Sequence, residues 1–218
     1  MILEWDKQAT LFFNGSSNLC WDEIVYVATS TLTWVPLGMV MLWVLWKNLS
    51  LRQFIYAVSF LILAVFISDQ LSSSVFKPLF QRWRPTQDLH IMYMVDAIHD
   101  YRGGRYGFFS AHASNTFSVA VFLFCLLRRR FLGWSIVSWA LLNCYTRLYL
   151  GVHYLGDVLV GICWGVLIGF LLSRIFRYKI SGGQKTQIVI SDSHAAIFSV
   201  AIVLSYCMVF FVALIRLW

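Results

Sequence analysis

The segment TRLYLGVHYLGD, residues 146–157, places one arginine, one histidine and one aspartate between two long apolar runs. These runs lie near residues 134–150 and 155–176, and a helix of roughly 20 apolar residues crosses the ~30 Å hydrocarbon core of a membrane. Ionisable side chains in such surroundings are costly and usually functional. The segment therefore predicts two membrane-spanning helices joined by a turn at Gly151, with a functional site at that turn.

Four further apolar runs continue this pattern, near residues 24–46, 51–74, 112–132 and 195–215. The chain of 218 residues is 60% hydrophobic and 12% charged, whereas about a quarter of a soluble domain is charged. This composition excludes a soluble protein. We therefore expect an all-α integral membrane bundle of about six transmembrane helices, folded as a single domain over residues 1–218.

The first twenty residues mix Glu4, Asp6 and Lys7 with Trp5 and several other apolar side chains. They lack the basic start and the small-residue cleavage site of a signal peptide. The mixture is typical of an amphipathic helix that lies in the membrane interface. We expect an interfacial N-terminal helix.

The net charge of +7 is spread over the loops and forms no dense basic block, so the expected partner is the lipid bilayer and not nucleic acid. Nine of the 17 Lys and Arg residues lie in the loops near 47–52, 128–130 and 174–185. Because basic loops tend to remain in the cytoplasm, the turn at Gly151 should face the periplasm or the outside. The expected location is the cytoplasmic (inner) membrane.

Three polar clusters fall on that outer side: KPLFQRWRP at 77–85, FFSAHASN at 108–115 and the segment 146–157. In the last cluster, His153 and Asp157 stand four residues apart and so share one face of a helix. A carboxylate in that position holds the imidazole in one tautomer and leaves the other ring nitrogen free. Taken alone, the pair could also be a buried structural contact.

Three cations, Lys77, Arg84 and Arg147, come from the first and third clusters. Ser110 in the second cluster is an expected helix N-cap, and the free N–H groups behind it favour an anion. Since the arginine fork fits phosphate oxygens, the three clusters together predict a phosphate site. Three other arginines on this side are expected to reach lipid headgroups: Arg82, Arg102 and Arg105.

These residues resemble the signature of the type 2 phosphatidic acid phosphatase (PAP2) family of membrane-bound lipid phosphatases. The family's three blocks are Lys, six residues, Arg-Pro; then Pro-Ser-Gly-His; then Ser-Arg, five residues, His, three residues, Asp. Every spacing is preserved here, from Lys77 to Arg84-Pro85, from Ser110 to His112, and from Thr146-Arg147 through His153 to Asp157. The resemblance covers about residues 65–175, which is the expected catalytic core.

The chain departs from the family signature at three positions. Phe109 stands in place of proline, Ala111 in place of glycine and Thr146 in place of serine. The Cβ of Ala111 narrows the approach of a phosphate to the backbone N–H groups, and Thr146 keeps the hydroxyl. None of the departures removes an ionisable group, so we expect them to tune the site and not to abolish it.

The resemblance implies a lipid phosphatase that works through a phosphohistidine intermediate. It assigns the attack on phosphorus to His153, the orientation of that ring to Asp157, and proton transfer to and from the leaving oxygen and water to His112. It assigns the phosphate oxygens to Lys77, Arg84, Arg147, Ser110 and Ala111. Neither a metal nor any other cofactor is implied.

Three residues near these blocks are expected to support the site from behind. Asp69 precedes Lys77 by eight residues, Asn115 follows His112 by one helical turn, and Thr146 adjoins the third block. A role for Asp69 in helix packing is the alternative. The segment 86–108, which mixes aromatic, acidic and basic residues, is expected to lie above the entrance and to select the headgroup.

The substrates found within the resembling family leave several lipids open, namely lipid A, undecaprenyl diphosphate and phosphatidylglycerophosphate. The short form, with an interfacial segment and two helices before the first block, resembles bacterial members that include lipid A phosphatases. Two other functions also remain open: transfer of the phosphoryl group to a second lipid, and lipid binding or transport without chemistry. The oligomeric state is not predicted.

Overall fold

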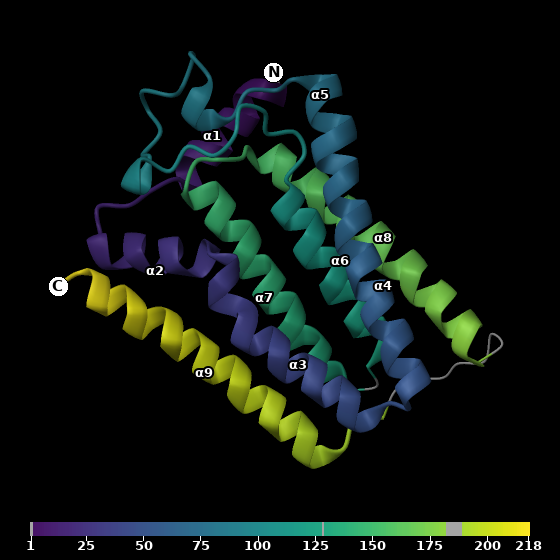
Figure 1. The fold of residues 1–218 in the computed structure, drawn as a ribbon. Helices are drawn as coiled ribbons and strands as arrows, with labels where there is room; N and C mark the ends of the chain where they lie inside the picture. Colours follow the sequence, from purple (N-terminus) through teal and green to yellow (C-terminus); the bar gives the residue numbers. More distant parts are fainter. Residues whose placement is uncertain (1, 128, 182–188) are drawn as a thin grey trace.

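The computed structural model describes residues 2–127, 129–181 and 189–218, and this part of the chain is helical with no strand. The all-α expectation is therefore confirmed for the described residues. Nine α-helices follow one another: α1 (Ile2–Phe13), α2 (Leu19–Thr29), α3 (Val35–Asn48), α4 (Leu51–Gln70), α5 (Lys77–Phe80), α6 (Ala111–Leu126), α7 (Arg130–Tyr149), α8 (Leu155–Ser181) and α9 (Asp192–Arg216) (Figure 1).

Three helical stretches are long and apolar enough to cross a membrane: Leu51–Phe80, Leu155–Ile180 and Asp192–Arg216. The first predicted span is different, because α2 and the stretch Thr31–Asn48 meet at an angle of 72°. The extended backbone of Ser30 ends α2 and causes the bend. The 16-residue α6 is shorter than a usual span. Each of the six predicted segments contains a helix, although α6 ends at Leu126 and not near 132; among the described residues three segments, or four with the bent pair, meet the length and composition of a span.

The helix that leads to the first polar cluster extends beyond residue 74, where we expect it to end. A single π-helical turn, Leu71–Phe76, joins α4 directly to α5, so the helix continues from Leu51 to Phe80. It stops where Gln81 adopts a left-handed conformation with φ of 45°. Lys77 therefore projects from the last turn of a long helix.

Helices α6 and α8 pack closely because α8 presents a stripe of glycines to the backbone of α6. A Cβ added to Gly161, Gly165 or Gly169 would lie 2.5–2.6 Å from a carbonyl oxygen of α6 or its N-cap. The carbonyls belong to Ser110, Ser114 and Ser118. The glycines of α8 and the carbonyls that they contact therefore both recur every four residues. Small residues at this spacing allow two helices to approach closely within a membrane. The stripe sets the distance between the second and third polar clusters.

Replacing Gly165 by Ala should destabilise the fold by about 1–3 kcal/mol, because the added Cβ would overlap the Ser114 carbonyl oxygen 2.6 Å away. The matched control is Gly38→Ala in α3, where an added Cβ meets no atom within 4 Å. Denaturation midpoints in detergent would measure both. Equal midpoints for the two variants would contradict the close α6–α8 contact.

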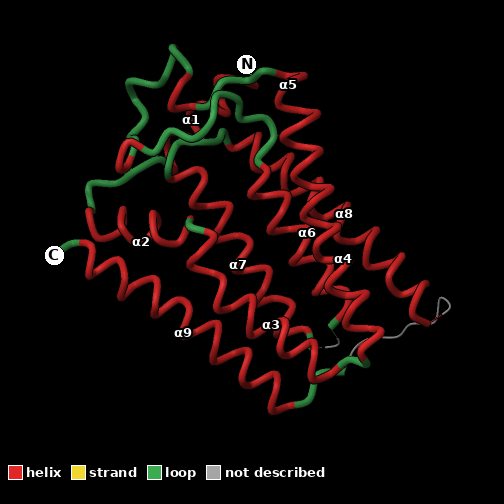
Figure 2. The backbone as a smooth tube through the Cα atoms, viewed as in Figure 1, coloured by secondary structure: helices red, strands yellow, loops and turns green. Residues whose placement is uncertain are grey.

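The long connection between α5 and α6 and the helix α1 lie at one end of the bundle, whereas only short connections are visible at the other end (Figure 2). The three polar clusters also lie at the end that carries α1. There α1 caps α8 from outside. Thr10 Oγ1 accepts from the backbone N–H of Leu155 (3.0 Å), and Asp6 Oδ1 accepts from that of Gly156 (2.7 Å). These two N–H groups are among those that a helix start leaves free. The N-terminal helix thus anchors the start of the helix that carries Asp157.

Candidate active site

A polar pocket of about 250 Å³ lies at this end of the bundle and brings the three predicted clusters together. Its lining includes all three predicted cations, both predicted histidines and two of the predicted supporting residues: Lys77, Arg84, Arg147, His112, His153, Asp69 and Asn115. Ala111 also lines it. Residues up to 84 positions apart in the sequence therefore share one cavity, because α5, α6 and the α7–α8 turn converge there.

None of the three cations forms an ion pair within the described part of the chain. Arg84 donates from Nη1 to the carbonyl of Val152 (3.0 Å). Arg147 donates to the hydroxyls of Thr29 and Tyr101. Both guanidinium groups are buried, and each keeps a buried Nε–H without a partner. Buried donors of this kind normally find an acceptor.

The three cations also act on one another. Burial and the nearby Arg147 lower the pKa of Arg84 to about 10, so its guanidinium remains charged at neutral pH. Positive groups held together without carboxylate partners repel one another, and an anion placed between them relieves that repulsion. The pocket is therefore suited to a small, highly charged anion.

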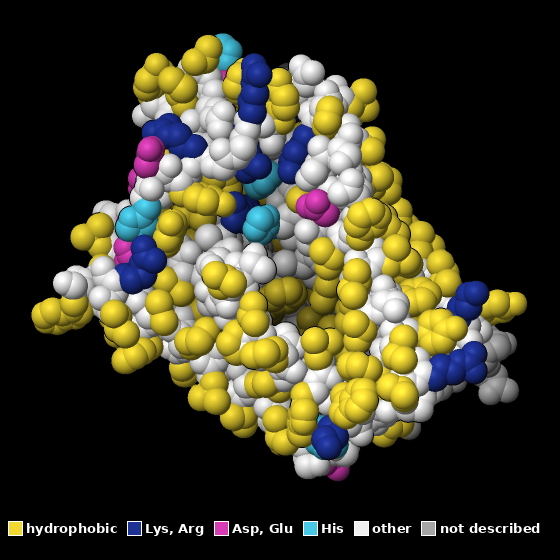
Figure 3. All heavy atoms as spheres, in the orientation of Figure 1, with side chains coloured by type: hydrophobic (Ala, Val, Ile, Leu, Met, Phe, Trp, Pro, Cys, Tyr) yellow, Lys and Arg dark blue, Asp and Glu magenta, His cyan; other side chains and the backbone are white. Residues whose placement is uncertain are grey.

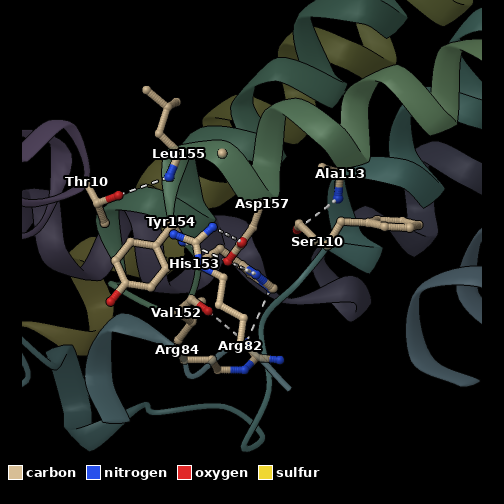
Figure 4. Close-up of polar contacts among 12 residues, drawn as sticks. Thr10, Arg82, Arg84, Ser110, Ala113, Val152, His153, Tyr154, Leu155 and Asp157 are labelled. Carbon is tan, nitrogen blue, oxygen red and sulfur yellow. Dashed lines mark hydrogen bonds and ion pairs between the residues drawn. The ribbon is translucent and has the colours of Figure 1, made fainter. Parts of the chain in front are cut away.

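His153 lies between this pocket and Asp157 (Figure 4). Its Nδ1 is 3.6 Å from Asp157 Oδ2, and its Nε2 is 3.3 Å from Arg84 Nη1. Since a guanidinium can only donate, Nε2 is the acceptor, and the ring proton is therefore on Nδ1, toward the carboxylate. Burial first, and then Arg84, Arg147 and Lys77, lower the pKa of His153 well below its usual value. The imidazole is thus neutral, with the lone pair of Nε2 directed to the pocket side.

Asp157 is fully buried and is held by two further groups. The backbone N–H of Tyr154 donates to its Oδ2 (3.1 Å), and Arg82 donates from Nη1 to its Oδ1 (2.8 Å). The other amino group of Arg82 donates to Asp6 in α1 (2.6 Å), and its guanidinium stacks 4.1 Å from the centre of the Tyr154 ring. The prediction that Arg82 reaches lipid headgroups is wrong, because two carboxylates and an aromatic face hold it inside the protein.

The chain Asp6–Arg82–Asp157–His153 therefore links the N-terminal helix to the pocket. The pairing of Arg82 with Asp6 and Asp157 was not predicted from the sequence. A sequence signal was available, since Asp6 is an acidic residue within a largely apolar opening segment and Arg82 lies two residues before a signature arginine. Their pairing depends on contacts between residues 76 and 75 positions apart, which no local spacing reveals.

Ser110 and Thr146 lie at the edge of this arrangement and not in the lining of the pocket. Ser110 is the N-cap of α6, as predicted, since its hydroxyl accepts from the backbone N–H of Ala113 (3.4 Å). Its own backbone N–H donates to the carbonyl of Asp157 (3.0 Å), which ties α6 to α8. The Thr146 hydroxyl donates to the Thr29 hydroxyl (3.1 Å), which also accepts from Arg147. Thr146 thus helps to hold the side chain that positions Arg147.

The segment 86–108 contributes to the pocket, and Tyr101, Gly103 and Gly104 form part of its lining. Tyr101 accepts from Arg147, and His99, in the same segment, contacts Glu23 of α2 (2.6 Å). Part of the segment thus lines the pocket, whereas its expected position above the entrance and its role in selecting the headgroup stay predictions. Within the described residues no group of three or more His, Cys, Asp or Glu side chains could hold a metal ion.

The backbone at Gly107 passes so close to His153 and Asp157 that there is no space for a Cβ at this position. A Cβ at this position would lie 2.9 Å from Asp157 Oδ2 and 3.6 Å from His153 Nδ1. Gly107→Ala should therefore displace the carboxylate and lower kcat by about 10- to 100-fold, because small displacements of a positioned group have effects of that size. Leu89→Ala, at an exposed position of the same segment that does not line the pocket, should lose much less. Similar kcat values for the two variants would contradict the role of this approach.

Comparison with known proteins agrees with this geometry. The model of the PAP2 superfamily matches residues 53–181. The lipid A 4'-phosphatase of Bacteroides thetaiotaomicron is 40% identical over 167 residues, which cover 76% of this chain and 74% of that protein. The lipid A 4'-phosphatase of Porphyromonas gingivalis is 35% identical over 177 residues, 81% of this chain and 75% of that protein.

A shorter similarity is found to the undecaprenyl-diphosphatase BcrC of Bacillus subtilis, which is 37% identical over 59 residues, 27% of this chain and 31% of that protein. No solved structure shows a significant match to the chain. The similarities to the two lipid A 4'-phosphatases thus extend over most of the chain, whereas that to the diphosphatase is confined to about a quarter of it.

Proposed function

This chain belongs to the PAP2 superfamily and is a membrane lipid phosphatase, and we propose that it removes the 4'-phosphate of lipid A. The observation that carries the chemistry is the pocket in which three cations without ion-pair partners among the described residues lie with a neutral histidine, whose Nε2 accepts from one of them, Arg84. The two lipid A 4'-phosphatases, similar over about three quarters of the chain or more, support the choice of lipid.

In the first step, His153 Nε2 attacks the phosphorus atom, a nitrogen–phosphorus bond forms and the bond from phosphorus to the sugar oxygen breaks. Asp157 stabilises the positive charge that develops on the imidazole. His112 gives its proton to the leaving oxygen. The bound phosphate offsets part of the positive field around His112, which favours the protonated ring before this transfer.

In the second step, water attacks the phosphohistidine, the nitrogen–phosphorus bond breaks and inorganic phosphate leaves. His112, now neutral, takes a proton from the attacking water and returns to its starting state. Throughout, Lys77, Arg84 and Arg147 donate to the oxygens of the phosphoryl group, with the start of α6 at Ser110 and Ala111 beside them. Fixed cations of this kind stabilise a phosphoryl transition state by electrostatics and positioning.

We also propose that residues 65–175 form the catalytic core and that the pocket faces outward from the cytoplasmic membrane. Two observations support this orientation. Lys47 and Arg52 lie where α3 meets α4, and Arg174, Arg177 and Lys179 lie in the last turns of α8, at the helix ends away from the pocket; basic residues at helix ends favour the cytoplasm. The exposed Trp5 and Phe12 of α1 suit a helix that lies in the interface beside the pocket.

The test is phosphate release by purified protein in detergent, with lipid A, undecaprenyl diphosphate and phosphatidylglycerophosphate compared at equal concentration. We expect the highest kcat/KM with lipid A, and mass spectrometry of the product should show loss from the 4' position. A metal chelator should leave the rate unchanged. Transfer of label to a second lipid with little free phosphate would favour a phosphotransferase instead. Folded protein that releases phosphate from none of the lipids would overturn the proposed function.

A further inference from the structure

A second, larger cavity of about 730 Å³ adjoins the phosphate pocket. Its walls come from α3, α4, α6, α7 and α9, and nearly all of the lining side chains are apolar. Two residues, Asp69 and Asn115, line both cavities and so mark the neck between them. Figure 3 shows this face hollowed between α3 and α4, with hydrophobic side chains inside the hollow and histidine and basic side chains at its upper end.

On two helices the side chains that line the cavities are polar on the pocket side of this neck and apolar on the other side. On α6, His112, Asn115, Val119 and Leu123 follow one another at spacings of three or four residues and so share a face. The helix from Leu51 to Phe80 does the same, with Lys77, Ser73 and Asp69 above a wall that includes Val65, Phe66 and Ile62. A ligand that entered both cavities would have a charged head in one and a hydrocarbon tail in the other.

The neck itself holds acceptors that the described part of the chain does not satisfy. Asn115 Oδ1 is buried and has no hydrogen-bond partner. The carboxylate of Asp69 likewise makes no hydrogen bond or ion pair with another described side chain. Its charge acts on Lys77 only through longer-range electrostatics. An acceptor left unpaired at an apolar boundary costs free energy until a donor reaches it.

We propose that Asp69 and Asn115 form a specificity site that accepts hydrogen bonds from the amide N–H that joins an acyl chain to the phosphorylated sugar, or from a free hydroxyl beside that junction, while the chain occupies the apolar cavity. This inference rests on the proposed function and deepens it. The volume and the few convergent polar groups are those of a ligand site, for which about 300–1,000 Å³ is usual. The occupant is therefore a lipid with donors directly beside its phosphate.

Two classes of lipid phosphate differ in the hydrogen-bond donors that lie beside the phosphate. An acylated glucosamine phosphate carries amide and hydroxyl donors between its phosphate and its chains. A polyprenyl diphosphate passes directly from diphosphate to hydrocarbon and has no donor at that level, so it would leave the buried Oδ1 of Asn115 unpaired and offer no donor to the half-buried Asp69. Sites built to pair with a substrate donor reject analogues that lack it.

The first experiment compares kcat/KM for lipid A and for undecaprenyl diphosphate in the wild-type protein, Asn115→Leu and Asp69→Leu, because leucine cannot accept a hydrogen bond. We expect each substitution to lower the ratio of kcat/KM for lipid A to that for undecaprenyl diphosphate by about tenfold, whatever common loss it causes on both lipids. Gln70→Leu is the matched control, because Gln70 adjoins Asp69 but is exposed on the outside of the helix. Equal losses on both lipids, or no loss on lipid A, would overturn the specificity site.

A binding experiment tests the specificity site independently of whether the protein hydrolyses lipid A. Labelled lipid A and undecaprenyl diphosphate would be titrated onto the inactive His153→Ala protein with and without Asn115→Leu. The second substitution should weaken the binding of lipid A about tenfold and that of undecaprenyl diphosphate little. If the wild-type protein hydrolyses no lipid, the proposed function fails, and this binding difference still decides whether the specificity site exists. Unchanged affinity for lipid A would reject it.

Discussion

Replacing His153 by Ala should lower kcat for phosphate release by about 10⁴-fold or more, because no other side chain can take the place of its nucleophile. Nε2 of this ring carries the lone pair on the side of the pocket, with Arg84 at 3.3 Å and the Asp157 carboxylate behind Nδ1. The remaining cations would still bind the substrate phosphate. We therefore expect KM to change far less than kcat, as measured by phosphate release over a range of lipid concentrations.

His90→Ala is the matched control, since His90 is an exposed histidine of the segment 86–108 and does not line the pocket. It should keep most of the wild-type kcat. Rapid acid-free quenching of the wild-type enzyme should also trap an acid-labile phosphohistidine that is missing from His153→Ala. Substantial turnover in His153→Ala would mean that water or another residue attacks phosphorus directly, and the two-step mechanism would then be wrong.

Arg82→Leu should lower both stability and activity, although Arg82 does not line the pocket. It would leave Asp157, a fully buried carboxylate, and Asp6 without the cation that pairs with both. Removing one partner of a buried ion pair costs about 3–5 kcal/mol, and because Arg82 is about one fifth exposed we expect about 2–3 kcal/mol. Displacement of Asp157 should lower kcat by about 10²-fold, with KM little changed.

Arg105→Leu tests whether these losses belong to the ion pairs and not to the loss of any loop arginine. Arg105 stacks on Trp83 and Tyr106 and has no carboxylate partner among the described residues. The double variant Arg82→Leu/Asp157→Asn should recover part of the stability, because it removes the unpaired charge, but it should not recover activity. If Arg82→Leu behaves like Arg105→Leu in both denaturation and kinetics, the positioning role of Arg82 is wrong.

The sequence predicted the charged and histidine side chains that line the polar pocket, although not every lining residue, since Ser73 was not expected there. Lys77, Arg84, His112, Arg147 and His153 were all expected there and all lie there. Their intervals are short enough for helix geometry to determine which face each side chain occupies, and burying charge in a membrane is too costly to be incidental. The same reasoning placed Asp69 and Asn115 next to the pocket, and it identified Ser110 as the cap of α6.

Other features could have been read from the sequence but were missed. Gly161, Gly165 and Gly169 recur every four residues in an apolar helix, which is a known signal for close helix packing. The count of full spans was less well predicted, because apolar content does not distinguish a helix that faces lipid from one buried inside the bundle. The bend at Ser30 and the short α6 show that difference.

The sequence by itself determined that this is a helical membrane protein and predicted that three blocks of regularly spaced charged residues form one site, since periodicity and the cost of buried charge act locally. Only the tertiary structure decided what surrounds that site: the pairing of Arg82 with Asp6 and Asp157, the approach of Gly107, and the apolar cavity beyond Asp69 and Asn115. Each of these depends on packing between segments far apart in the chain. Such contacts follow from the complete arrangement of the helices, and no local pattern specifies them.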